Sequence, residues 1–122
     1  MRLQDTPELG GPLDGGVFAG LTTQKDGTHC AVVLLPGKGY GLKWSDAKAW
    51  ATEQGGELPN RSVAALLFAN VKDQLIPEGH WAADEDSASF ARYCSFYRGD
   101  LTIYHKGFEG SAVAVRLLSP EA

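Results

Sequence analysis

The chain has little cysteine, no excess of basic residues and no long apolar run, and each shortage excludes a class of protein. Two cysteines are too few for a disulfide scaffold, so we expect Cys30 and Cys94 to be reduced, buried and slow to react with thiol reagents. A net charge of -4 argues against nucleic-acid binding, which requires a basic surface. No stretch approaches the roughly 20 apolar residues of a membrane-spanning helix.

The length of 122 residues suits one domain with a single core. Residues 1–16 are rich in Gly, Pro and Asp, which predicts a flexible N-terminal arm before a domain that spans residues 17–119. Residues 17–22 and 29–35 have the composition of strands, with a turn at Asp26-Gly27 between them. Residues 36–39 are expected to end the second strand.

Two helices are predicted in the middle of the chain. The first has Ser45 as its N-cap and ends at Gly55-Gly56, and the second has Asn60 as its N-cap and reaches about residue 73. Trp50 lies on the apolar stripe of the first helix, which we expect to cover the strand at residues 29–35. Helices clustered between two groups of strands indicate an α+β fold, with two helices packed on a mostly antiparallel sheet.

Seven of the twelve aromatic residues lie between Trp81 and Phe108, where the pattern predicts an exposed β-meander. If Gly99-Asp100 forms a two-residue hairpin turn, Phe96 faces Ile103 and Cys94 faces His105. Because side chains alternate along a strand, one buried face then collects Phe90, Cys94, Phe96, Leu101 and Ile103. The opposite, exposed face collects Tyr93, Ser95, Tyr97, Thr102, Tyr104 and Lys106.

The tyrosine-bearing face has the composition of a binding surface, because tyrosine offers a ring and a hydroxyl at a small cost in rotamer entropy. Arg98 and Asp100 would add a charged rim. Arg98-Gly99-Asp100 also spells an integrin-recognition tripeptide, but a hairpin turn formed by Gly-Asp is the stronger interpretation. The residues predicted to bind a ligand or partner are Trp81, Tyr93, Tyr97, Arg98, Asp100, Tyr104 and Lys106.

Neither catalysis nor a metal or other cofactor is expected. The predicted pairing of Cys94 with His105 resembles a nucleophile and its base, but it places the thiol on the buried face, where thiols are inert. The three histidines lack the spacing of a zinc site. Asp84-Glu85-Asp86 is either half of a calcium-binding pattern or a solvated acidic turn.

Four motifs, in this order, resemble one family. They are Trp44-Ser45-Asp46-Ala47, Gly55-Gly56-Glu57-Leu58-Pro59-Asn60-Arg61, His80-Trp81-Ala82-Ala83-Asp84 and Ala112-Val113-Ala114-Val115-Arg116-Leu117-Leu118. The set resembles the domain-of-unknown-function family related to the C-terminal domain of the Legionella collagen-like adhesin, whose members occur in bacterial lipoproteins and in phage or prophage proteins. The resemblance covers roughly residues 17–119 and differs from the family pattern in lacking its usual hydroxyls at Asn60 and Ala82-Ala83 and its first arginine at Val113.

The resemblance implies a C-type-lectin-like fold, with two layers of helix and sheet under the meander and with the termini near each other. It also implies a non-enzymatic phage- or prophage-type binding module that recognises a host or phage protein, or a surface glycan. The meander contains no asparagine, which argues against diversification by adenine-directed mutagenesis. The alternative is a structural or accessory virion component whose meander makes subunit contacts, and a homo-oligomer is compatible with either function.

The expected compartment follows from the N-terminus, which lacks the hydrophobic segment of a secretory signal. We therefore expect the protein in the host cytoplasm or in a virion, with no membrane and no nucleic acid among its partners.

Overall fold

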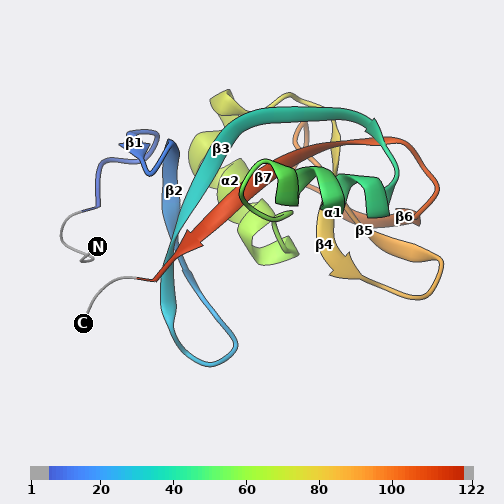
Figure 1. Ribbon diagram of the computed structural model, residues 1–122, viewed down its shortest axis with the longest axis horizontal. Coiled ribbons are helices and arrows are strands. Elements are labelled where there is room, and N and C mark those ends of the chain that lie inside the picture. The colour runs from blue at the N-terminus through green and yellow to red at the C-terminus, as the bar shows by residue number, and fades with distance from the viewer. Residues whose placement is uncertain (1–5, 120–122) are drawn as a thin grey trace.

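The computed structural model describes residues 6–119, which form an α+β protein with a seven-stranded mixed sheet and two helices (Figure 1). Neighbouring strands are antiparallel except β4 and β7, in the order β1-β2-β3-β7-β4-β5-β6. The predicted α+β class and the mostly antiparallel sheet are therefore confirmed. The elements are β1 (Pro12–Leu13), β2 (Gly16–Thr23), β3 (His29–Leu42), α1 (Trp44–Glu53), α2 (Arg61–Val71), the 3-10 turn η2 (Lys72–Gln74), β4 (Gly79–Glu85), β5 (Phe90–Ser95), β6 (Leu101–His105) and β7 (Gly110–Leu118).

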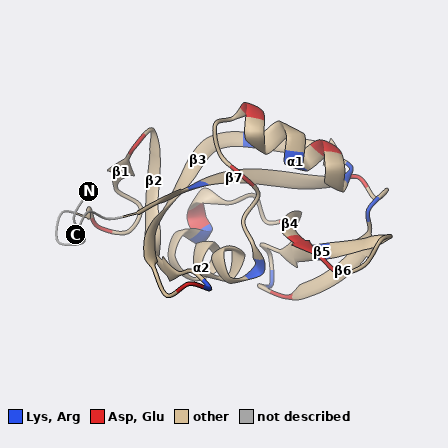
Figure 2. Cartoon of the chain, turned by 60° about the horizontal axis from the view of Figure 1, so that its bottom comes forward, with Lys and Arg blue, Asp and Glu red and all other residues tan. Residues whose placement is uncertain are grey.

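The two helices cover opposite faces of the sheet, with α1 above β3 and β7 and α2 below them (Figure 2). Each helix closes its own apolar core. The core on the α2 side contains Val32, Leu34, Val63, Leu67, Cys94, Phe96, Val113 and Val115, among others. The core on the α1 side includes Val33, Leu35, Trp44, Ala47, Trp81, Tyr93, Ala112 and Ala114. The expected two layers are thus wrong: alternate residues of β3 and β7 are apolar on both sides, so both faces require a cover.

The start of α1 differs from the prediction. The N-cap is Lys43 instead of Ser45, and no side chain bonds to the first turn. Trp44 is drawn into the helix because its backbone N–H donates to the Lys106 carbonyl and its indole Nε1 donates to the Ala82 carbonyl, 2.9 Å away. The N-cap of α2 is confirmed, since Asn60 Oδ1 accepts a hydrogen bond from the Val63 N–H at 2.9 Å.

Strand β3 is twice as long as predicted and does not end at residues 36–39. Its pairing with β7 shifts between Leu34 and Lys38 and then resumes, so Pro36 lies at an irregularity of the ladder. Gly37 and Gly39 allow α1 to lie close to the strand: a Cβ on Gly39 would come within 3.2 Å of the Trp50 ring. Glycine at this point therefore permits helix packing and does not terminate the strand.

The β5–β6 hairpin is closed by a longer loop than the predicted two-residue turn at Gly99-Asp100. The Ser95 N–H donates to the Asp100 carbonyl, and the Ser95 hydroxyl accepts from the backbone N–H groups of Tyr97 and Arg98. Gly99 has a φ of 82°, which glycine adopts without strain. The loop of residues 96–99 releases Phe96 from the ladder, and its ring packs 4.5 Å from that of His80 in the core.

As a result the predicted register is wrong by four residues: in the structure Cys94 lies opposite Leu101, and Phe90 lies opposite His105. A shift by an even number keeps each side chain on its predicted face, so the division into two faces survives. The burial of those faces differs, because Phe90 and Ile103 are 39% and 38% exposed while Phe96 is buried. The helix α2 reaches only the loop end of the hairpin, which leaves the far end of that face uncovered.

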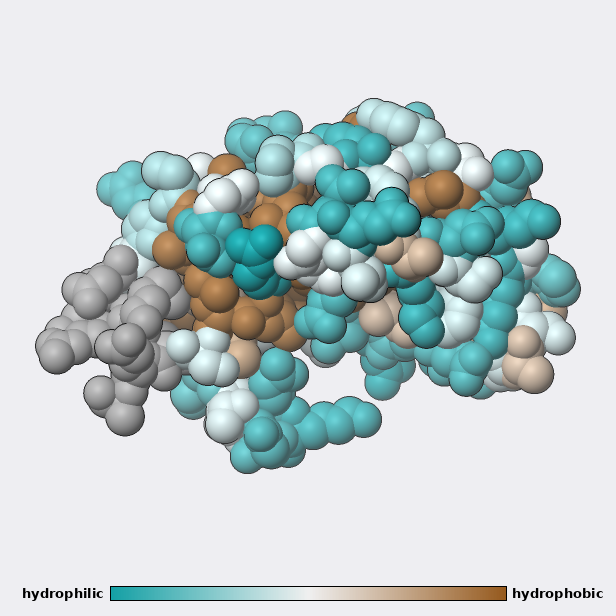
Figure 3. All heavy atoms as spheres, viewed as in Figure 1, coloured by the Kyte–Doolittle hydropathy of each residue, from teal (hydrophilic) through white to brown (hydrophobic). Residues whose placement is uncertain are grey.

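The proposed N-terminal arm lies partly outside the described residues, which begin at Thr6. Within the described part, Pro12–Leu13 pair with β2, and the Gly10 N–H donates to the Phe18 carbonyl. On the face that carries α1, apolar atoms gather beside the helix, over β2, β3 and β7 (Figure 3). No helix of the described residues combines the length and apolar character required to cross a bilayer.

Candidate functional site

The structure separates the predicted site residues into buried and exposed groups. Trp81 is fully buried and Tyr93 is only 9% exposed, so the expectation that both lie on an open surface is wrong. Both belong to the core on the α1 side, and the Trp81 indole donates to the Leu42 carbonyl at 2.8 Å. Trp81 and Tyr93 are buried because α1 covers the second face of the meander, which was expected to be open.

Tyr93 fits into this core because glycine lines its ring. A Cβ on Gly79 would lie 2.1 Å from the ring, and one on Gly110 would lie 2.6 Å from it. Burial raises the pKa of the Tyr93 hydroxyl to about 12, so the group is neutral at physiological pH. Tyr93 is therefore a structural support for the surface and not part of it.

Above Tyr93 lies an exposed pair of rings, Tyr104 and Phe108, which together with Tyr93 we call the aromatic triad. Tyr104 and Phe108 are stacked with their centroids 4.9 Å apart and their planes at 14°. The ring of Tyr93 meets both edge-on, at 4.7 Å and 5.7 Å. The upper two rings are 43% and 45% exposed. The result is a preassembled aromatic surface fixed to the core from below.

Phe108 was missed by the sequence argument, because it follows β6 in a turn and no strand alternation applies to it. The Phe108 N–H donates to the His105 carbonyl, which folds the turn back over β6 and sets the ring against Tyr104. The one available signal was the clustering of aromatic residues up to Phe108.

The Lys106 side chain is held by contacts within the chain. Its ammonium binds Glu85 Oε2 and the Ala88 carbonyl and lies 4.7 Å from the centroid of the Trp44 ring. The same contact with Lys106 holds the pKa of the exposed Glu85 carboxyl below its ordinary value. The side chain therefore ties the β4–β5 loop to the start of α1, and little of its charge faces solvent.

Tyr97, Arg98 and Asp100 are exposed as predicted, but they lie at the loop end of the hairpin. Tyr97 is 67% exposed, and Arg98 pairs with Asp100 at 3.5 Å in a solvated ion pair. The length of β6 separates this loop from the Tyr104–Phe108 stack, which lies at the other end of the strand. The structure thus divides the predicted surface into two small exposed groups instead of one.

The residues considered for catalysis lie apart. Cys94 is not opposite His105, and burial raises the pKa of its thiol to about 12. Its Sγ donates to the His80 carbonyl, 3.5 Å away. Cys30 and Cys94 are both buried and unbridged, which confirms that part of the prediction.

His80, one of the three histidines considered for a zinc site, is a fully buried polar residue. Its Nδ1 lies 2.9 Å from the Glu78 carbonyl and donates to it, and its Nε2 has no partner among the described residues. Burial lowers the pKa of His80. The ring packs against Phe96 and behaves as a core residue.

The three carboxylates of residues 84–86 each contact a different partner. Asp84 accepts from the Arg61 N–H at 2.7 Å, Glu85 binds Lys106, and Asp86 pairs with Arg92 at 3.6 Å. Among residues 6–119 no three His, Cys, Asp or Glu side chains converge in a metal-binding group. The arrangement supports the acidic-turn interpretation over the calcium site.

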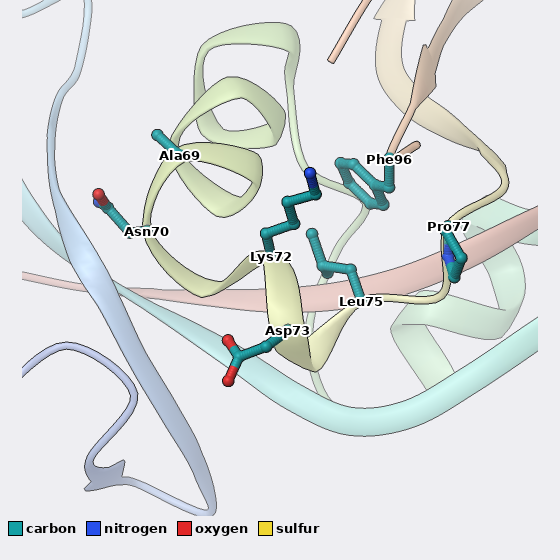
Figure 4. Close-up of a pocket in the computed structure, with 7 residues that line it drawn as sticks. All are labelled: Ala69, Asn70, Lys72, Asp73, Leu75, Pro77 and Phe96. Carbon is teal, nitrogen blue, oxygen red and sulfur yellow. The ribbon is translucent and has the colours of Figure 1, made fainter. Parts of the chain in front are cut away.

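A hollow of about 510 Å³, which the sequence argument did not anticipate, lies beside the end of α2 (Figure 4). Lys72 and Asp73 extend from η2 in different directions there, and the Lys72 ammonium lies 5.0 Å from the centroid of the Phe68 ring. The surface is open and mainly apolar. It is lined by Ala69, Asn70, Lys72, Asp73, Leu75, Pro77 and Phe96.

No protein-family model matches the chain, and no curated protein matches it.

Proposed function

We propose that this protein is a non-enzymatic binding module, of phage or prophage type, that recognises a protein partner or a surface glycan through the exposed end of its meander. The observation that carries the proposal is the parallel Tyr104–Phe108 stack, nearly half exposed and held from below by Tyr93. Two large exposed rings that pack on each other instead of entering a core are an unusual use of apolar surface for a small protein.

The stack suits recognition because it is already assembled. Its rings lose little freedom on binding, since Tyr93 and the turn at residues 106–108 hold them in place. A flat apolar surface with one hydroxyl at its edge matches the apolar face of a sugar ring, and equally an apolar side chain of a protein. The loop with Arg98 and Asp100 would meet the rim of a larger partner and change the rate of encounter more than the affinity.

A C-type-lectin-like fold for this module rests on the resemblance of the four motifs. The arrangement is compatible with it: β2 and β7, the first long strand and the last, both pair with β3, and the meander extends from one end of the sheet (Figure 1).

Alanine substitution of Tyr104 and Phe108 tests the proposal. The two probes are an array of immobilised bacterial surface glycans and a cross-linking experiment in host-cell extract. We expect one of them to report a ligand for the native chain, and Tyr104→Ala and Phe108→Ala to weaken that binding at least tenfold. Tyr40→Ala is the control, because Tyr40 is 60% exposed and lies on β3, outside the meander. Equal binding by the double variant would locate the site elsewhere.

The second candidate function is that of an accessory virion component whose meander makes subunit contacts. The observation in its favour is that every residue of β6, the strand at one edge of the sheet, is exposed. Purified virions that contain the protein in fixed stoichiometry would support this function, and its absence from them would favour the binding module.

A further inference from the structure

Strand β6 is the last strand of the sheet and pairs only with β5 among the described residues (Figure 2). Its hydrogen-bonding pattern identifies the groups on the free side. The Asp100 carbonyl accepts from the Ser95 N–H, and the Lys106 N–H donates to the Ser89 carbonyl, so positions 100 and 106 face β5. Because these groups alternate along an antiparallel strand, the backbone N–H and C=O groups of Leu101, Ile103 and His105 point away from the sheet.

Apart from the turn that follows His105, this edge has none of the features that usually protect one. The sequence Leu-Thr-Ile-Tyr-His contains no charged residue and no proline, and the β5–β6 ladder has no bulge. The opposite edge of the sheet is protected, since β1 has two residues and one of them is Pro12. An uncharged edge strand with half-exposed Leu101 and Ile103 is ready to pair with another strand.

We propose that β6 pairs antiparallel with β6 of a second copy of this chain, about a two-fold axis that passes beside Ile103. In this register Ile103 faces Ile103 of the second copy, and Leu101 faces His105. The three outward-facing residues of each copy then become three hydrogen-bonded pairs, which join the two sheets into one. The His105 carbonyl already accepts from the Phe108 N–H and uses its second lone pair.

The side chains are self-complementary in the same register. The two Ile103 side chains meet on the face that also carries Phe90 and Leu101, so apolar groups that are now about two-fifths exposed become covered. The pairing brings no like charges face to face, because the five residues of β6 include no Asp, Glu, Lys or Arg. A register shifted by two residues would lose the Ile103 pair.

The contact is small, because each copy contributes one strand of five residues. We therefore expect a reversible dimer whose population depends on concentration. The pairing uses the backbone of β6 and does not rest on the proposed function, which depends on the side chains of Tyr104 and Phe108.

Sedimentation equilibrium of the full chain over a concentration series is the first test. We expect a dimer, and we expect Ile103→Lys to weaken it at least tenfold, because two ammonium groups would meet at the axis. Leu21→Lys is the matched control, since Leu21 is 45% exposed on β2, far along the sheet order from β6. A native chain that is monomeric at about 1 mM, where a complex with a millimolar dissociation constant would be populated, overturns the proposal and leaves a strand of another protein as the occupant.

Cysteine substitution tests the register and does not depend on the strength of the dimer. Cα atoms of a hydrogen-bonded antiparallel pair lie about 5.5 Å apart, within disulfide range. Ile103→Cys is therefore expected to form a disulfide-linked dimer under mild oxidation, while Thr102→Cys, whose copies are offset by two positions, forms it at least tenfold more slowly. Cys30 and Cys94 are buried and do not compete. Equal rates for the two variants, or a faster rate for Thr102→Cys, would overturn the register.

Discussion

Replacing Tyr93 with alanine distinguishes the observed packing of the meander from the surface predicted by the sequence. The ring of Tyr93 meets those of Trp81, Tyr104 and Phe108 edge-on, with centroids 5.0, 4.7 and 5.7 Å apart. Burial of an aromatic side chain of about 200 Å² contributes roughly 5 kcal/mol at about 25 cal/mol per Å², and part of this is retained by alanine. We expect Tyr93→Ala to reduce the free energy of unfolding by about 3–5 kcal/mol, as buried aromatic truncations do.

Equilibrium unfolding in urea, followed by tryptophan fluorescence, measures this loss. Trp81 is a direct reporter because it contacts the substituted ring. Tyr97→Ala is the matched control, since its side chain is 67% exposed, and we expect its effect to stay within about 0.5 kcal/mol. If Tyr93→Ala is no more destabilising than Tyr97→Ala, Tyr93 is a surface residue and the assignment of a second core to the meander is wrong.

Three further predictions concern the two cores. Trp50→Ala is expected to cost about 3 kcal/mol in urea unfolding, because the partly buried ring packs on Gly39 of β3; a cost below about 1 kcal/mol would contradict that packing. Cys30 and Cys94 are expected to react with a thiol reagent only on unfolding, because both are buried and burial raises the pKa of the Cys94 thiol, and fast labelling of either in the native protein would refute this. Because burial lowers the pKa of His80, the unfolded chain binds a proton that the native chain does not, so stability is lost as pH falls below about 6.5, by at most about 1.4 kcal/mol per pH unit. His80→Gln should remove this part of the slope, and an unchanged slope would show that His80 does not titrate on unfolding.

Local patterns predicted the elements well where a residue acts on its immediate neighbours. Asn60 caps α2 through its own side chain, and the alternation of Leu34 and Val33 reflects two real faces of β3. The division of the hairpin into two faces was also recovered, because the true register differs from the predicted one by an even number of residues.

What the sequence could not supply depends on distant parts of the chain. The position of α1 on the second face decides the burial of Trp81 and Tyr93, and no local pattern records it. The loop closed by Ser95 competes with a Gly-Asp turn of similar local preference, and the burial of Phe96 decides between them. The Tyr104–Phe108 stack depends on a turn that follows the strand, where periodicity no longer applies.

The boundary between β7 and β4 has a consequence for how this protein unfolds. The two strands share a single parallel bridge, His80 to Ser111, so the backbone alone would let the meander separate from the rest of the sheet. Two indoles cross this boundary in opposite directions: Trp81 donates to the Leu42 carbonyl, and Trp44 donates to the Ala82 carbonyl. Detachment of the meander would strip both indoles of their partners and open both cores at once. The meander therefore cannot open as an independent foldon, and its slowest-exchanging amides should share the opening free energy of β3 and β7.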